Sequence, residues 1–232
     1  MWADLKYAIN VFVEFIKAFN HLHSMGPCVT IFGSARFKED HIYYKQTREL
    51  ASEIAKLGFT ILTGGGPGIM EAANRGAKDV GGKSVGCNIV LEMEQHPNAY
   101  LDKWVNIKYF FIRKTLLIKY SYAFIVMPGG FGTLDEFYEA LTLVQTKKIS
   151  SFPIIIFDRD FYIGITEHNE KMLSAGTISA DDLKLFLITD SIPEAVNYIK
   201  EKSITGFHLT YADNTKPFWS FFGSSNNKNV GN

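Results

Sequence analysis

The stretch Ala123–Leu141, AFIVMPGGFGTLDEFYEAL, changes character within a few residues. An apolar run ends at Pro128, glycines follow at positions 129, 130 and 132, and a helical pattern begins at Thr133. Glycines at such a corner let backbone amides approach a ligand closely, because no Cβ atoms intervene. The unpaired amides and the positive dipole end of the helix would face the same place. The stretch therefore predicts a phosphate cradle built mainly from backbone.

An ordinary helix cap is the alternative interpretation of this corner. Thr133–Glu136 fits the pattern T-x-x-E, in which the glutamate only satisfies a backbone amide. A cap does not account for three glycines, nor for the second glycine-rich corner at Thr63–Gly68, so a ligand site is favoured. In a first helical turn, Glu136 would be kept ionised by the helix dipole, which suits a base or a cation stabiliser better than a proton donor.

Strand-like and helical patterns alternate on both sides of this corner. The expected strands are CVTIFGSA, FTILTGGG, KSVGCNIV, WVNIKYFF, Ala123–Met127, FPIIIFD and LKLFLITD. The expected helices cover residues 43–57, 68–78, 113–120, 133–146, 162–175 and 192–200. Continuous apolar strands that alternate with helices indicate an α/β fold, with a doubly wound, mainly parallel sheet and helices on both of its faces.

Three of the expected strand ends carry unusual residues, namely Gly33–Arg36, Thr63–Gly68 and Pro128–Thr133. Ligands of open parallel sheets bind at the carboxyl ends of strands, near the point where the strand order reverses. We therefore expect these three corners to converge on one binding site. The dinucleotide fingerprint is incomplete, because Ile69 stands where its third glycine would fall, and NAD is disfavoured. The P-loop-like GGKS of Gly81–Ser84 leads into a strand and is interpreted as a turn.

The pair Arg113-Lys114 is expected to open the helix that precedes the Ala123 strand. Two adjacent cations are unfavourable at a helix N-terminus, and a nearby anion would offset that cost. A solvated basic corner is the alternative. Arg113 is the better candidate for a binding role, because its planar guanidinium can hold phosphate or sugar oxygens bidentately.

The composition excludes several classes of partner. The 232 residues include 24 basic and 24 acidic side chains, so the formal net charge is zero and no nucleic-acid footprint is expected. Cys28 and Cys87 stand alone in apolar runs, which predicts buried thiols in a reducing cytosol and no metal site.

We divide the chain into an N-terminal helix (residues 1–25), a domain (26–205) and a polar tail (206–232), which is expected to be partly disordered. The helix has no basic leader and is interrupted by polar residues, so neither a secretion signal nor a membrane span is expected, and a cytoplasmic location is predicted. It is expected to pack on the domain, or alternatively to form a dimer interface, through apolar residues at helical spacing: Leu5, Ile9, Phe12, Val13, Ile16 and Phe19.

Together, GGGPGIMEAANRGA, FIRK and PGGFGTLDE resemble the Lonely Guy family, whose members were long labelled lysine decarboxylases. The family motif P-G-G-x-G-T-x-x-E is complete from Pro128 to Glu136, and the similarity covers roughly Val29–Lys200. The turn Gly66-Pro67-Gly68 replaces the serine-containing turn of plant members, and the N-terminal helix is longer than theirs. Both features resemble the bacterial branch.

This resemblance implies a Rossmann-like fold and a homo-oligomer, most simply a homodimer, with sites near the subunit interface. It also implies a phosphoribohydrolase that converts cytokinin riboside 5′-monophosphates, AMP or both to free base and ribose 5-phosphate, without a cofactor. Arg113 and Glu136 would be the catalytic pair. The expected substrate-binding residues come from the three corners and from the family motif: Gly33, Ser34, Gly64, Gly65, Gly66, Glu94, Lys114, Pro128, Gly129, Gly130, Phe131, Gly132, Thr133 and Thr142.

Cleavage of a ribosyl–base bond builds positive charge on the sugar. Glu136 would stabilise that charge and orient or deprotonate the attacking water, while Arg113 anchors the substrate, because a guanidinium does not act as an ordinary acid. One alternative is a non-catalytic carrier of a nucleotide or of molybdenum cofactor, which could use the same cradle. The other is a pyridoxal phosphate decarboxylase, for which the sequence singles out no Schiff-base lysine.

Overall fold

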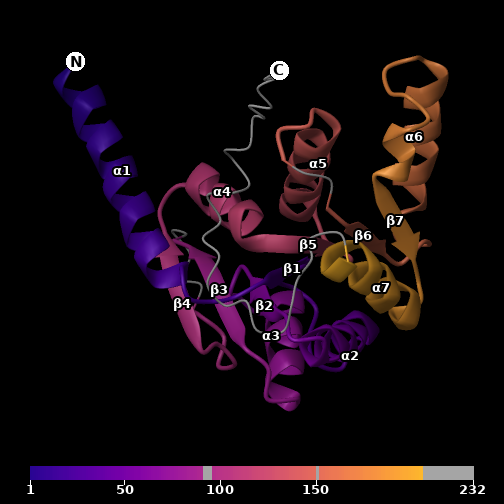
Figure 1. Ribbon diagram of the computed structural model, residues 1–232, viewed down its shortest axis with the longest axis horizontal. Helices are drawn as coiled ribbons and strands as arrows, with labels where there is room; N and C mark the ends of the chain where they lie inside the picture. The colour runs from indigo at the N-terminus through magenta and orange to yellow at the C-terminus, as the bar shows by residue number, and fades with distance from the viewer. Residues whose placement is uncertain (91–95, 150–151, 206–232) are drawn as a thin grey trace, which may run out of the picture.

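The computed structural model describes residues 1–90, 96–149 and 152–205. Glu94 and the predicted tail from residue 206 lie outside these ranges. Seven parallel strands form one sheet in the order β4-β3-β2-β1-β5-β6-β7 (Figure 1). The strands are β1 (Cys28–Phe32), β2 (Thr60–Thr63), β3 (Ser84–Ile89), β4 (Lys103–Ile107), β5 (Ser121–Val126), β6 (Ile154–Phe157) and β7 (Phe186–Thr189).

Helices connect most of the strands and cover the sheet on both faces. They are α1 (Trp2–Leu22), α2 (Ile42–Lys56), α3 (Ile69–Asp79), α4 (Phe110–Tyr120), α5 (Phe131–Gln145), α6 (Ile163–Ser174) and α7 (Ile192–Ile199). Two short helices, η1 (Asp182–Lys184) and η2 (Lys200–Thr205), flank β7 and α7. The GGKS segment leads from the turn after α3 into β3, whose first residue is Ser84, as expected.

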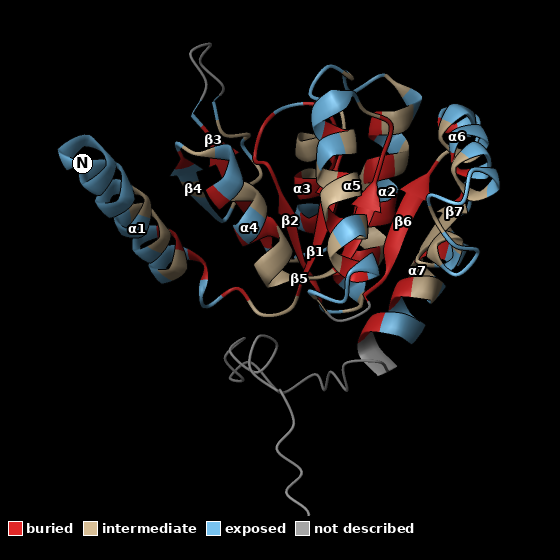
Figure 2. Ribbon diagram, turned by 90° about the horizontal axis from the view of Figure 1, so that it is seen from above, coloured by how far each residue is buried: buried red, intermediate tan, exposed pale blue. Residues whose placement is uncertain are grey.

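Two hydrophobic cores lie on opposite faces of the sheet. One contains side chains of α1, α4 and α5, and the other contains side chains of α2, α3 and α7. Every residue of β1, β2, β3 and β6 is buried, because helices pack against both of their faces (Figure 2). The expected doubly wound α/β fold is confirmed, and the seven described strands are all parallel.

The strand order reverses between β1 and β5, which pair from Val29–Ala123 to Phe32–Val126. From β1 the chain builds outward to β4, and from β5 it builds in the other direction to β7. The connections that leave β1 and β5 lead to α2 and α5, which contribute to the cores on opposite faces. A crevice at the carboxyl ends of these two strands is the usual ligand site of such folds.

Two helices begin earlier than the sequence pattern suggests. Helix α5 begins at Phe131, where Leu134 N donates to Gly130 O at 3.1 Å, and α4 begins at Phe110, because β4 already ends at Ile107. The interpretation of Thr133 as a helix cap is therefore wrong. The cation pair that begins at Arg113 lies one turn inside α4, so the argument from an unfavourable dipole does not apply.

Helix α1 packs through a different face from the one expected. Val11, Phe15, Ala18 and Leu22 contact the core, together with Phe19, which was the one expected residue to do so. The other expected residues form an exposed apolar stripe: Leu5, Ile9, Phe12, Val13 and Ile16. The N-terminal part of α1 extends beyond the body of the domain (Figures 1 and 2). None of the described helices has both the length and the apolarity that crossing a membrane requires.

Candidate active site

A hollow of about 280 Å³ opens at the carboxyl ends of β1, β2 and β5. The three corners that the sequence singled out all contribute to it. Its lining includes Gly33, Ser34, Ala35 and Arg36 after β1, Gly64 after β2, and Gly130, Gly132 and Thr133 after β5. Arg113, Glu136, Ile31, Phe32, Met70, Ile89 and Phe110 complete the lining.

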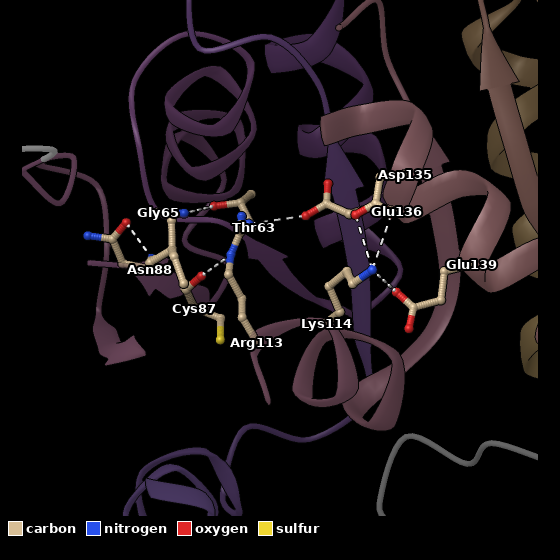
Figure 3. A network of polar contacts seen from close by, with 10 residues as sticks. Thr63, Gly65, Cys87, Asn88, Arg113, Lys114, Asp135, Glu136 and Glu139 are labelled. Atoms are coloured by element: carbon tan, nitrogen blue, oxygen red, sulfur yellow. Dashed lines mark hydrogen bonds and ion pairs between the residues drawn. The ribbon is translucent and has the colours of Figure 1, made fainter. Parts of the chain in front are cut away.

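Arg113 and Glu136 form an ion pair at one side of this cavity. Arg113 Nη1 lies 3.2 Å from Glu136 Oε1, and only 12% of each side chain is exposed. The Arg113 Nε donates a second hydrogen bond, of 3.0 Å, to the carbonyl oxygen of Cys87 (Figure 3). A Cβ atom at Gly64 would lie 2.3 Å from Arg113 Nη2, so glycine is needed there for the guanidinium to occupy its position.

Burial raises the pKa of the Glu136 carboxyl to about 7, and the Arg113 guanidinium opposes this shift without cancelling it. Glu136 lies in the second turn of α5, beyond the part of the helix where the dipole acts strongly. The expectation that the dipole keeps this carboxyl fully ionised is therefore wrong. A carboxyl with a pKa near neutrality is well matched to accept a proton at physiological pH.

The glycines after β5 have two separate functions. A Cβ at Gly129 would lie 2.2 Å from Thr133 Oγ1, so this glycine makes room for the buried Thr133 side chain. Cβ atoms at Gly130 and Gly132 would meet no atom within 4 Å. No side chain caps α5, and its first-turn amides, from Phe131 to Thr133, have no partners within the helix. Beside the ion pair, these amides and the open glycines offer unpaired backbone donors of the kind that hold anions at helix N-termini.

The corner after β1 is fastened to both of its neighbours. Ser34 N donates to Pro128 O at 3.1 Å, and Ile69 N, at the start of α3, donates to Ser34 O at 3.0 Å. A Cβ at Gly33 would lie 2.4 Å from the Ile69 side chain, so this glycine permits the close approach of β1 and α3.

The corner after β2 is braced by Asn98, a residue that the sequence analysis did not identify. Its amide nitrogen donates to the carbonyls of Gly65 and Gly66 and to Asn74 Oδ1. Thr63 Oγ1 donates to the same Asn74 oxygen and accepts from Gly65 N. Gly65 has a φ of +75° and neither it nor Gly66 lines the cavity, so both serve to shape the corner. No spacing in the sequence connects Asn98 with this turn.

Several expected binding residues lie away from the cavity. Thr142 is exposed on α5, where its hydroxyl donates to the carbonyl of Tyr138. Lys114 forms ion pairs with Asp135 and Glu139 on α5, at 3.1 and 2.9 Å (Figure 3). The Phe131 side chain is 94% exposed. Pro128 and Gly129 do not line the cavity, although Pro128 accepts the hydrogen bond from Ser34 N, and Glu94 lies outside the described residues.

Both cysteines are buried and unpaired, as the sequence analysis predicted. Burial raises the pKa of each thiol to about 12, so both are protonated at neutral pH. Cys87 contributes to the site through its carbonyl, which holds Arg113. Within the described residues, no three His, Cys, Asp or Glu side chains are grouped closely enough to share a metal ion.

The family model described as "Possible lysine decarboxylase" matches residues 70–199, which is more than half of the chain. The chain belongs to this family. The match includes the Arg113–Glu136 pair and the whole PGGFGTLDE segment, and the resemblance to Lonely Guy proteins is confirmed.

Several curated relatives of this chain are named cytokinin riboside 5′-monophosphate phosphoribohydrolases. That of Mycobacterium tuberculosis is 29% identical over 154 residues, covering 64% of this chain and 80% of its own. LOG4 of Arabidopsis thaliana is 25% identical over 184 residues, covering 77% of this chain and 83% of its own.

Among solved structures, the molybdenum cofactor binding protein of Rippkaea orientalis matches with a TM-score of 0.58 and 23% identity, covering 76% of this chain and 96% of its own. The molybdenum cofactor carrier protein of Chlamydomonas reinhardtii matches with a TM-score of 0.56 and 21% identity, covering 76% of this chain and 97% of its own. At these identities, the two structures establish the shared fold.

We expect Gly132→Ala to stabilise the protein and to weaken AMP binding. The added methyl group enters open space, and alanine in the first turn of a helix gains up to about 1 kcal/mol over glycine. The same methyl group obstructs the anion site, and we expect an affinity loss of about tenfold. Denaturant unfolding and isothermal titration with AMP measure the two effects.

Gly129→Ala is the matched control, and its free energy of unfolding should fall by about 1–3 kcal/mol because the added methyl group collides with Thr133. Equal AMP affinity in Gly132→Ala and wild type would contradict the anion site.

Proposed function

We propose that this protein hydrolyses the N-glycosidic bond of a purine nucleoside 5′-monophosphate and releases the free base and ribose 5-phosphate. The proposal rests chiefly on one observation, the buried Arg113–Glu136 pair beside the uncapped, glycine-lined start of α5. The names of the curated relatives support the reaction class and suggest a cytokinin ribotide as one substrate. AMP, with an unmodified base, is the second proposed substrate.

The 5′-phosphate binds at the first turn of α5, where the backbone amides from Phe131 to Thr133 point toward an anion without a competing cap. Gly130 and Gly132 let the phosphate oxygens approach these amides closely. The phosphate does not react, so its binding energy is used to hold the ribose against the catalytic pair.

Glu136 accepts a proton from the attacking water and stabilises the positive charge that develops on the ribose. The water oxygen forms a bond to C1′, the C1′–N bond breaks, and its electron pair leaves with the base, which then takes up a proton. Arg113 stays protonated throughout and orients both the substrate and Glu136. The carbonyl of Cys87 fixes the guanidinium from the other side, which prepares this geometry before the substrate arrives.

A molybdenum cofactor carrier is the second candidate, because the two proteins of similar fold are a molybdenum cofactor binding protein and a molybdenum cofactor carrier protein. A phosphate cradle alone fits both functions. The buried carboxyl with a pKa near neutrality favours the hydrolase, because a carrier has no use for a buried group that exchanges protons at physiological pH.

We propose a homodimer in the reducing cytoplasm, and we expect light scattering to give twice the 26.2 kDa mass of the chain. The apolar stripe of α1 supports the dimer, and the two free cysteines support the compartment. Phe12→Glu combined with Ile16→Glu should produce a monomer, because both residues are exposed on this stripe. Asn10→Glu, which adds a charge to the polar side of α1, is the control and should remain dimeric. A monomeric wild type would contradict the assembly.

Glu136→Gln should lower base release from AMP or isopentenyladenosine monophosphate by about a hundredfold or more, because the amide cannot accept the proton of the water. Chromatography of the released base measures this loss. Asp135→Asn is the matched control, since Asp135 is the neighbouring carboxylate, pairs with Lys114 and does not line the cavity. Near-normal turnover by Glu136→Gln would contradict the mechanism. Phosphate-dependent binding without any base release would favour the carrier.

The value of kcat/KM for AMP should rise with pH through about 7 and then level off, because the reaction uses the ionised form of Glu136. Initial rates between about pH 5.5 and 8.5 measure the profile. The phosphate of AMP also ionises near pH 6, and this would contribute to the profile. Its contribution is measured by titrating AMP binding to Glu136→Gln over the same pH range, because this variant lacks the Glu136 carboxyl. An activity that falls as the pH rises above 6 would indicate that protonated Glu136 acts as an acid.

A further inference from the structure

The five arginines of the chain differ in one respect. Four of them form ion pairs with carboxylates: Arg48 with Asp79, Arg75 with Glu39, Arg113 with Glu136, and Arg159 with Asp190. Arg36 forms no ion pair with any residue in the described part of the chain, and it is the one that lines the cavity from the β1 corner. Arg36 is exposed, so its side chain is available to a ligand that enters this cavity.

The backbone of Arg36 is held in place relative to the anion site. Arg36 N donates to Ser34 Oγ at 3.2 Å, and Ser34 N donates to the carbonyl of Pro128 at 3.1 Å. Two hydrogen bonds therefore connect Arg36 to the corner that carries Gly130 and Gly132. Arg36 belongs to the corner after β1, and the first-turn amides of α5 belong to the neighbouring corner of the same cavity.

The charge balance of the cavity leaves a role for this cation. Arg113 is paired with Glu136, and Lys114 is paired with Asp135 and Glu139. The start of α5 supplies a partial charge of only about +0.5. A phosphate monoester carries about −1.5 to −2 charges at neutral pH. Arg36 is the cavity-lining group that can supply the missing positive charge.

We propose that Arg36 binds the 5′-phosphate together with the first turn of α5, and that it makes the site selective for nucleotides over nucleosides. This inference rests on the proposed nucleotide substrate, but it concerns binding and can be tested without turnover. The planar guanidinium of Arg36 can contact two phosphate oxygens while the backbone amides of α5 hold the third.

The test compares Arg36→Ala with the Arg36-containing protein, both carrying Glu136→Gln so that no substrate is consumed. The ribose 5-phosphate titration is repeated with Glu136 intact, so that Arg113 keeps its counterion. Isothermal titration gives the dissociation constants of AMP, ribose 5-phosphate and adenosine. We expect Arg36→Ala to weaken both phosphorylated ligands about tenfold or more and to change adenosine binding less than twofold. Arg36→Lys should recover part of the affinity. Lys38→Ala is the matched control, since this exposed lysine of the same loop does not line the cavity.

Equal weakening of AMP and adenosine would place Arg36 at the sugar or base and would overturn the inference, as would unchanged affinity for all three ligands. When Glu136 is intact, Arg36→Ala should raise the KM for AMP and leave kcat nearly unchanged. If wild type binds AMP but releases no base, the hydrolase proposal fails, and the Arg36→Ala titrations still decide the role of Arg36. If AMP does not bind to wild type at all, both proposals fail.

Discussion

The reversal of strand order between β1 and β5 is the constraint on which the site depends. Because the connections after these two strands lead to helices on opposite faces, none of the described helices covers their carboxyl ends, and the Gly33–Arg36 and Pro128–Thr133 corners meet there. The hydrogen bond from Ser34 N to Pro128 O joins these corners directly. The ion pair and the glycine-lined start of α5 therefore lie at the centre of the sheet, and local motion of the edge strands has little effect on them.

The glycines at these corners are required by their neighbours for different reasons. Gly33 and Gly129 allow close packing against Ile69 and Thr133, whereas Gly64 allows Arg113 to lie over the end of β2. Gly130 and Gly132 face open space, and the protein surrounding them does not require a glycine. Gly132 lies in the first turn of α5, where glycine costs stability relative to alanine, so this position indicates a ligand.

The sequence was sufficient to predict the parallel α/β fold and the convergence of the three corners, because apolar strands and glycine turns are local patterns. It misplaced the starts of α4 and α5, where the chain turns helical at Phe110 and Phe131 without a capping side chain. The outward apolar face of α1 was also misjudged, since two apolar faces of one helix share the same periodicity. Asn98 was missed because its partners are distant in the chain.

The raised pKa of Glu136 connects function with stability. Its folded value of about 7 exceeds the value of 4.5 that is usual for an exposed glutamate, so folding takes up a proton between these two pH values. The free energy of unfolding therefore decreases as the pH rises across this window, and above about 7 the protein carries a constant cost of up to a few kcal/mol. The Arg113 guanidinium reduces this cost without removing it. A purely structural pair would gain stability by exposing the carboxylate to water, so the retained burial is better explained by proton transfer at neutral pH than by packing.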